Sequence, residues 1–376
     1  MSGISGAKLT GRHPGVEVVR LLPQNEKVVL SSQSSLPMHI PDAILSPAVA
    51  ATTGVIGVAG LMVCVRRVQE QLRDRTTVLM GTMAAFVFAA QMVNFPLFPL
   101  PISGHLLGGV LSAVILGPWA GAVVIAAVLI VQCLLFGDGG LTALGANFVN
   151  MGLIGSVCGY AIYAPIRRAV GGRTGVLVGA MGAAWFSVIL ASGAFAVELA
   201  ASGTGTGFLT VLGWIALVHA AIGLGEAVIT GLVIRFILSM RPDLIYETVP
   251  PDLPPVRRWG QILLAGLGVS LAVAIFLAPF ASEYDDGLEW VGAKLGFIKE
   301  EKTVFSAPIP EYKLPLHGLH HIKVATAVAG TVGTIVVFTV AFSLARMLTP
   351  ASHTAESTRD INDRQGVDAS GHGENI

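Results

Sequence analysis

Charged side chains are scarce in this sequence. Asp, Glu, Lys and Arg make up 12% of its 376 residues, whereas soluble domains carry about 25%. Acidic and basic residues balance at 23 each, so the chain lacks the basic excess that would attract nucleic acid. Hydrophobic residues make up 53%, and the mean hydropathy is +0.73. These values indicate several membrane-spanning segments, with the lipid bilayer as a partner.

Cysteines are also few. The three in the chain, Cys64, Cys133 and Cys158, all lie inside apolar runs. That placement is typical of small core residues and argues against a disulfide framework or a zinc site.

Patterns of catalytic residues are missing as well. The sequence has no HExxH pair, no recognisable Ser-His-Asp set and no clustered carboxylates in its apolar runs. Gly137-Asp138-Gly139-Gly140 is glycine-rich but lacks the Gly-Lys-Ser/Thr of a phosphate-binding loop. A membrane-embedded enzyme is therefore not favoured, and any ATP hydrolysis has to come from another subunit.

The apolar runs predict nine transmembrane helices, since a helix needs about 20 apolar residues to cross a bilayer. The run from 106 to 136 is too long for one span and is broken at Gly117-Pro118, which predicts a tight hairpin with a short first helix. The other predicted spans cover residues 48–65, 77–93, 144–164, 176–199, 208–238, 262–280 and 324–348. We expect an all-α polytopic membrane protein with a seven-helix bundle followed by a two-helix C-terminal unit.

The distribution of arginine predicts the orientation of these helices, because cytoplasmic loops carry an excess of Lys and Arg. Arginines gather in the loops after the first, fifth and seventh spans: Arg66, Arg67, Arg73, Arg75, Arg167, Arg168, Arg173, Arg235, Arg241, Arg257 and Arg258. The loops around 94–105, 137–143 and 200–207 hold neither Lys nor Arg. Met38, His39 and His105 are therefore expected together on the outer face.

A potential metal chelate precedes the first span, in the stretch Met38-His39-Ile40-Pro41-Asp42. If the chain began at Met38, its free amine, the His39 amide nitrogen and the His39 imidazole could close two chelate rings on one ion. Square-planar nitrogen ligation of this kind suits Ni(II) or Cu(II). The alternative is a surface histidine in a turn bounded by proline.

Three blocks of sequence resemble one transporter family. Residues 38–47 resemble the N-terminal signature of the CbiM/NikM family, the substrate-specific components of energy-coupling-factor cobalt and nickel transporters. Ser103-Gly104-His105, continued by Leu116-Gly117-Pro118, and the stretch from 135 to 151 resemble the same family in the same order. The resemblance covers roughly residues 38–240.

This resemblance implies a site and partners. His105 would be the fourth metal ligand beside Met38 and His39, with Ni²⁺ or Co²⁺ as the transported substrate. A transmembrane coupling subunit and cytoplasmic ATPase subunits would be the partners, and the protein would lie in the cell inner (plasma) membrane with its metal site facing outside. A metal-independent secondary transporter or channel is the alternative function.

A second resemblance lies near the C-terminus. Asp286-Gly287-Leu288-Glu289 resembles the small CbiN/NikN-type auxiliary component, known as the PDGLE domain, although Asp285 stands where that family usually has proline. The chain therefore resembles a fusion, which favours nickel over cobalt. The expected parts are a polar extension (1–37), the metal-binding unit (38–240), a cytoplasmic linker (241–260), the auxiliary unit (261–348) and a disordered tail (349–376). The extension is either a misplaced translation start or a disordered segment.

Several other polar residues have two interpretations. Ser103, Asp138 and Asn147 are candidates to orient the ligating histidines, or they cap helices. His219 and Glu226 share one face of the seventh span, where we expect hydrogen bonds within the bundle rather than metal ligation. His317, His320 and His321 form a loose outer cluster that either captures metal or lies in a solvated turn. Small-residue spacings such as Ala50 and Gly54 either pack inside the bundle or bind a partner.

Overall fold

The computed structural model describes residues 39–71, 74–205, 207–246, 259–297, 304–312 and 322–349. Within these ranges the chain is almost wholly helical, and the named strands are the two-residue β1 (Phe95–Pro96) and β2 (Ser103–Gly104). The all-α prediction is confirmed. The predicted N-terminal extension and residues 350–376 of the predicted tail lie outside the described residues, as do Met38, His317, His320 and His321.

Seven described helices are long and apolar enough to cross a membrane. They are α1 (Pro47–Gln71), α4 with η1 (Pro118–Val131, Gln132–Phe136), α5 with η2 and α6 (Leu144–Asn147, Phe148–Cys158, Gly159–Val170), α7 (Gly172–Ala201), α8 (Phe208–Met240), α9 with η4 and η5 (Trp259–Ala272, Val273–Leu277, Ala278–Phe280), and α11 (Ile322–Leu348). Apolar side chains face outward from them, as Leu217 (63% exposed) and Phe236 (64%) do on α8. Such an apolar exterior suits lipid, so the chain is a multi-pass membrane protein.

The predicted second span and the predicted short first helix of the hairpin are both present, and both are shorter than the seven helices above. The apolar part of α2 (Asp74–Gln91) covers only Thr76–Gln91, and α3 (Gly109–Leu116) has eight residues. The predicted hairpin is present, because α3 packs against α4 and the chain turns at Gly117. The residues before α3 are not helical, and Gly108 has a left-handed φ of 75° that prevents the helix from starting earlier.

Glu226 compensates for this late start of α3. Its carboxylate accepts hydrogen bonds from the backbone N–H groups of Leu107 (2.6 Å) and Gly108 (2.9 Å). Amides that precede a helix have no partner within it, and inside a membrane they need another acceptor. The hydrogen bond predicted for Glu226 within the bundle is therefore confirmed, and it holds the segment that carries His105.

Small residues on α1 pack inside the bundle. A side chain on Gly145 of α5 would run into the backbone of Gly54, so the two helices approach more closely than larger residues would allow. The backbone of Gly54 therefore lies at the contact between α1 and α5. Cys64 and Cys133 are buried as expected, whereas Cys158 is exposed.

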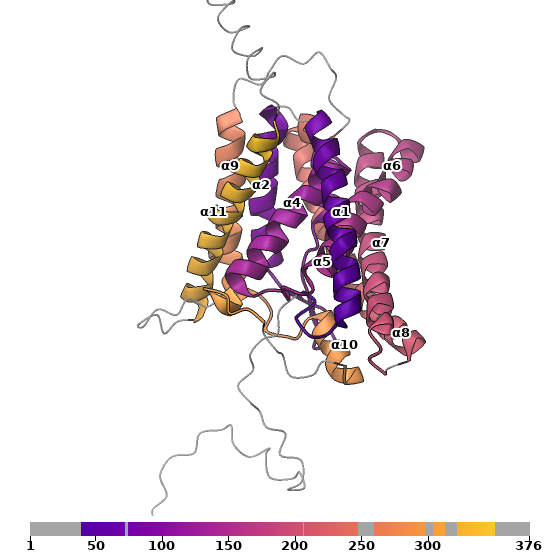
Figure 1. The fold of residues 1–376 in the computed structure, drawn as a ribbon. Helices are drawn as coiled ribbons and strands as arrows, with labels where there is room; N and C mark the ends of the chain where they lie inside the picture. Colours follow the sequence, from indigo (N-terminus) through magenta and orange to yellow (C-terminus); the bar gives the residue numbers. More distant parts are fainter. Residues whose placement is uncertain are drawn as a thin grey trace, which may run out of the picture. The chain divides into compact units, whose positions relative to one another are not determined.

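The C-terminal helices contact the bundle on two sides. α9 and α11 pack against α2, while the short α10 (Gly287–Leu295) packs against α8 (Figure 1). The connecting segments are bound to the loop after α2 and to η1: Ser282 N–H donates to Asn94 O (2.9 Å), and Ile309 N–H donates to Leu135 O (3.0 Å). Residues of the C-terminal unit thus reach the end of the bundle that holds His39.

Candidate metal site

The segment that begins at His39 is buried at the end of the bundle. Ile40 exchanges two hydrogen bonds with the Asn147 side chain: its N–H donates to Oδ1 (3.0 Å), and its carbonyl accepts from Nδ2 (3.1 Å). The Ile40 carbonyl also accepts from Gly140 N–H (2.9 Å), and Asp42 Oδ1 accepts from Thr142 N–H (2.8 Å). The backbone next to His39 is therefore fixed by the loop before α5.

Glycines allow that loop to lie flat against the segment. Gly139 has a φ of 91°, and a side chain there would meet the Cβ of His39 at 3.0 Å. A side chain on Gly140 would collide with the backbone of Asp42. The Gly137-Asp138-Gly139-Gly140 motif thus forms a close-fitting support for residues 39–42, with the Asp138 side chain turned toward His39.

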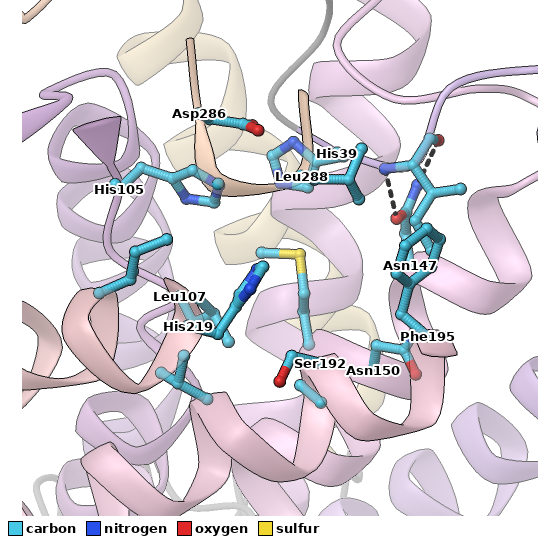
Figure 2. Close-up of a pocket in the computed structure, with 17 residues that line it drawn as sticks. His39, His105, Leu107, Asn147, Asn150, Ser192, Phe195, His219, Asp286 and Leu288 are labelled. Atoms are coloured by element: carbon cyan, nitrogen blue, oxygen red, sulfur yellow. Dashed lines mark hydrogen bonds between the residues drawn. The ribbon is translucent and has the colours of Figure 1, made fainter. Parts of the chain in front are cut away.

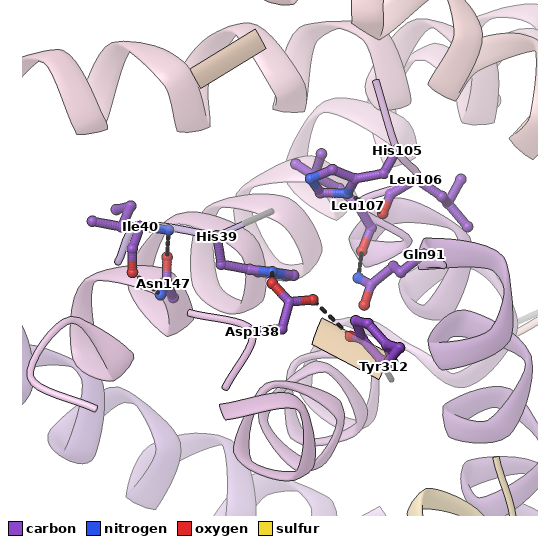
Figure 3. Close-up of polar contacts among 9 residues, drawn as sticks. All are labelled: His39, Ile40, Gln91, His105, Leu106, Leu107, Asp138, Asn147 and Tyr312. Atoms are coloured by element: carbon purple, nitrogen blue, oxygen red, sulfur yellow. Dashed lines mark hydrogen bonds and ion pairs between the residues drawn. The ribbon is translucent and has the colours of Figure 1, made fainter. Parts of the chain in front are cut away.

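Asp138 connects His39 to the C-terminal unit. His39 Nδ1 lies 3.0 Å from Asp138 Oδ1, and the Tyr312 hydroxyl donates to Asp138 Oδ2 at 2.6 Å (Figure 3). Burial by itself would raise the pKa of Asp138, but the charge of His39 and the hydrogen bonds from His39 and Tyr312 outweigh it and lower that pKa. The carboxylate is therefore ionised and held at both oxygens.

His39 presents its other nitrogen to a small cavity whose lining is mostly apolar. The side chain is buried, and among the described residues Nε2 has no hydrogen-bond partner. The cavity holds about 80 Å³ of space for water-sized occupants. Its lining includes His39, Asn147, Asn150, Met151, Ser192, His105, His219 and Asp286 (Figure 2).

His105 faces His39 across this cavity. The two ring centroids lie 5.4 Å apart, and Figure 2 shows both rings directed toward the cavity. His105 is half-buried, and its Nδ1 lies 3.1 Å from the Leu106 carbonyl oxygen. Because imidazole nitrogens bind divalent ions at about 2 Å, two rings at this separation can reach the same ion.

The three candidate supporting residues behave differently. Asp138 contacts the His39 ring, and Asn147 fixes the backbone of the following residue. Ser103 does neither, because its hydroxyl donates to the Tyr284 carbonyl (2.7 Å) in the C-terminal unit. Asn147 is the residue before η2, but its side chain makes no capping hydrogen bond there. Their roles toward a metal ion remain predictions.

The sequence did not single out several residues of the site. Asp286 lines the cavity and caps α10, and burial raises its pKa to about 7. The Asp-Gly-Leu-Glu motif marked this position without indicating that it reaches the histidines. Tyr312 carried no signal at all. His219 also lines the cavity, and its Nδ1 lies 2.8 Å from the Ile215 carbonyl, which confirms the hydrogen bond expected within the bundle.

The described side chains do not form a complete metal site by themselves. Within the described ranges, no three His, Cys, Asp or Glu residues converge closely enough to hold an ion. Two imidazoles face each other, and the backbone at His39 is rigidly held. The arrangement can bind a divalent ion if main-chain or N-terminal donors complete the coordination.

A membrane-spanning bundle with two facing histidines at one end defines this protein as a multi-pass membrane protein with a small internal pocket. The chain belongs to the CbiM family, described as the cobalt uptake substrate-specific transmembrane region, whose family model matches residues 39–244. Residues 260–350 match the PDGLE domain. Both resemblances predicted from the sequence are confirmed.

Relatives with the same pair of domains are known. A protein of Archaeoglobus fulgidus, provisionally named fused nickel transport protein NikMN, is 36% identical over 82% of this chain and 98% of its own length. The fused nickel transport protein NikMN of Rhodobacter capsulatus is 31% identical over 73% of this chain and 88% of its own length. A crystal structure described as a truncated transition metal transporter is 32% identical, covers 54% of this chain and 98% of its own, and has a TM-score of 0.48.

Proposed function

We propose that this protein is the substrate-specific membrane component of an ATP-driven energy-coupling-factor importer for Ni²⁺ or Co²⁺. The observation that carries the proposal is the pair of facing imidazoles, His39 and His105, whose ring centroids lie 5.4 Å apart beside a small cavity. Membership of the cobalt uptake family supports metal transport. The names of the fused relatives favour nickel as the substrate.

The proposed ligands are the Met38 amine, the amide and imidazole nitrogens of His39, and the imidazole of His105. Such a set suits Ni(II), which accepts square-planar nitrogen ligation. It also fits the lack of a three-side-chain metal cluster among the described residues, since only two of the four donors are side-chain groups. The tightly held backbone at Ile40 would keep the chelating residues in one conformation.

The chelate requires a particular edge of the His39 ring. A six-membered ring with the His39 amide uses Nδ1, yet in the structure Nδ1 faces Asp138. A half-turn of the imidazole about Cβ–Cγ would release Nδ1 and bring the Nε2 edge toward Asp138. The carboxylate would then accept the second ring N–H, as carboxylates commonly do beside metal-bound histidines. Metal loading is therefore proposed to include this rotation.

Transport needs partners that this sequence does not supply. Because the sequence contains no ATPase signature, cytoplasmic ATPase subunits and a transmembrane coupling subunit are proposed to drive release of the ion inside the cell. The arginine-rich end of the bundle would face the cytoplasm and the His39 end the exterior of the inner membrane. A metal-independent transporter or channel would bind no Ni²⁺ at His39 and His105.

Calorimetric titration with Ni²⁺ of the purified protein that begins at Met38, which is the unaltered protein in the tests below, measures this function. The unaltered protein should bind one ion tightly, and His105→Ala should abolish tight binding while circular dichroism shows intact helices. His353→Ala, outside both family-matched regions, is the matched control and should bind as the unaltered protein does. Unchanged affinity in His105→Ala would remove His105 from the site, and lack of binding by the unaltered protein would reject the function.

A further inference from the structure

We propose that the C-terminal unit forms part of the metal pocket: Tyr312 positions His39 through Asp138, and Asp286 provides a negatively charged wall beside the two histidines. This inference rests on the proposed function and adds residues that act on the same site. Neither residue is assigned as a metal ligand.

Tyr312 is held firmly in place to contact Asp138. Its ring stacks on Phe136 with centroids 4.5 Å apart and an interplanar angle of 20°, and it also lies against Phe88 at 6.2 Å. Tyr312 and Glu311 have positive φ values of 56° and 53°. Non-glycine residues keep this unfavourable conformation only where surrounding contacts impose it, often at functional sites.

The contact with Tyr312 determines how Asp138 meets His39. Oδ1 of the carboxylate faces His39 and Oδ2 accepts from the Tyr312 hydroxyl, so the plane of the carboxylate is fixed from both sides. An oriented carboxylate fixes the tautomer and direction of a metal-bound imidazole and raises its basicity. Without the hydroxyl, the buried Oδ2 would lose its hydrogen bond and Asp138 could turn away from the ring.

Asp286 reaches the cavity because the C-terminal unit is paired with the His105 segment. Ser103 N–H donates to Asp285 O (2.8 Å), and Ser103 forms a parallel bridge with Asp286. Asp286 Oδ1 accepts from Glu289 N–H (2.8 Å), and Asp286 N–H donates to Glu289 Oε2 (2.9 Å). These bonds fix the buried carboxyl beside His39 and His105, as Figure 2 shows.

A carboxyl at this position attracts a divalent cation. A nearby cation also favours the ionised form of a carboxyl, and we expect an entering ion to meet a carboxylate oxygen here. Asparagine in its place keeps the oxygen that caps α10 and removes only the charge. A purely structural Asp286 would therefore tolerate Asp286→Asn without any change in ion binding.

The first test measures Ni²⁺ affinity in the protein that begins at Met38 and carries Tyr312→Phe. We expect affinity to fall about tenfold, as is typical when the group that orients a metal-bound histidine is changed, together with a shift of the Ni(II) ligand-field absorption band. Tyr284→Phe in the same unit is the control, because that phenol is 47% exposed and should have no effect. A dissociation constant within about twofold of the unaltered protein's, with an unchanged band, would overturn the positioning role.

A double-mutant cycle keeps the test decisive if Tyr312→Phe also reduces stability. Asp138→Asn should weaken binding on its own, and adding Tyr312→Phe to it should cause little further loss, because Tyr312 acts through Asp138. If the two substitutions cause additive losses of Ni²⁺ binding free energy, Tyr312 does not act through Asp138. If the unaltered protein binds no Ni²⁺, the proposed function fails; if it binds and the cycle is additive, only this inference fails.

The role of Asp286 is tested by the rate of Ni²⁺ association at pH 8, followed by tryptophan fluorescence. Asp286→Asn should slow association by roughly threefold or more and reduce its dependence on salt, since charge in a cleft steers a cation toward it. Asp285→Asn is the matched control, because Asp285 is exposed and its side chain is outside the cavity lining. Equal association rates for both variants and the unaltered protein would exclude the charged wall.

Discussion

The side chain of Asn147 pairs with the main chain of Ile40 through both of its polar groups, accepting at 3.0 Å and donating at 3.1 Å. The pair joins residues 107 positions apart and is buried at the end of the bundle. A carboxamide is needed for both bonds, because it has an acceptor and a donor side by side. The position of His39 therefore depends on the chemistry of Asn147 as well as on its own backbone.

Asn147→Asp should weaken Ni²⁺ binding about tenfold. The carboxylate can still accept from Ile40 N–H, but it repels the Ile40 carbonyl that Nδ2 now satisfies, at a cost of about 1–3 kcal/mol. Calorimetry measures the change, with Asn362→Asp, outside both matched regions, as the control. An affinity equal to that of the control would show that the backbone at Ile40 is held without this pair.

Glu226→Gln should destabilise the folded protein by about 1–3 kcal/mol, because one buried amide would face the NH₂ group of the glutamine instead of a carboxylate oxygen. It should also weaken Ni²⁺ binding, since Leu107 and Gly108 lie just after His105 in the chain. Unfolding in detergent measures stability. Glu70→Gln is the control: its pair with Arg67 has side chains 64% and 58% exposed and contributes little. Equal stability of the two variants would contradict the capping role of Glu226.

A protein that begins at Met38 should bind Ni²⁺ much more tightly than one that retains residues 1–37. In the longer form the Met38 nitrogen is an amide, whereas a free α-amine with a pKa of about 7.7–8.0 can release its proton to a metal near neutral pH. Inserting one alanine between Met38 and His39 should also weaken binding, because it enlarges the chelate ring. Equal calorimetric affinity for all three forms would show that the amine is not a ligand.

The orientation of the helix bundle in the membrane can be measured by cysteine labelling in whole cells. In a chain whose Cys64, Cys133 and Cys158 are replaced by alanine, Glu283→Cys at the His39 end should react with a membrane-impermeant maleimide. Glu70→Cys at the arginine-rich end should react only after the cells are opened. Both native side chains are exposed, so access alone does not distinguish them. Labelling of Glu70→Cys in intact cells would reverse the proposed topology.

Local features of the sequence account for the helices. Apolar runs of sufficient length predicted all seven helices that meet the length criterion among the described residues, and Gly117-Pro118 marked the turn between α3 and α4. The apolar part of α2 is shorter than a membrane span, and α3 is short, as the break at Gly117-Pro118 predicted. The late start of α3 depends on Glu226, more than 100 positions further along the chain. The average hydropathy of a short stretch of sequence does not reflect a contact at that distance.

Short motifs in the sequence identified His39 and His105 as candidate ligands, and the charge pattern predicted that both lie at one end of the bundle. Their 5.4 Å approach and the burial of His39 come from the fold. The hydrogen-bond partner of Ser103 could not be predicted, because a serine hydroxyl can donate to any carbonyl that the fold brings near it. Here that carbonyl belongs to Tyr284.

The sequence by itself determined that this is a helical membrane protein of the CbiM family, because hydropathy, arginine placement and short motifs are local properties of the chain. Only the tertiary structure decided what surrounds the histidines. Asp138 is 99 positions from His39, and Tyr312 is 174 positions from Asp138. Contacts across such separations arise from the packing of loops that carry no periodic pattern. The contacts of Asp138 with His39 and Tyr312 are therefore visible only in the folded chain.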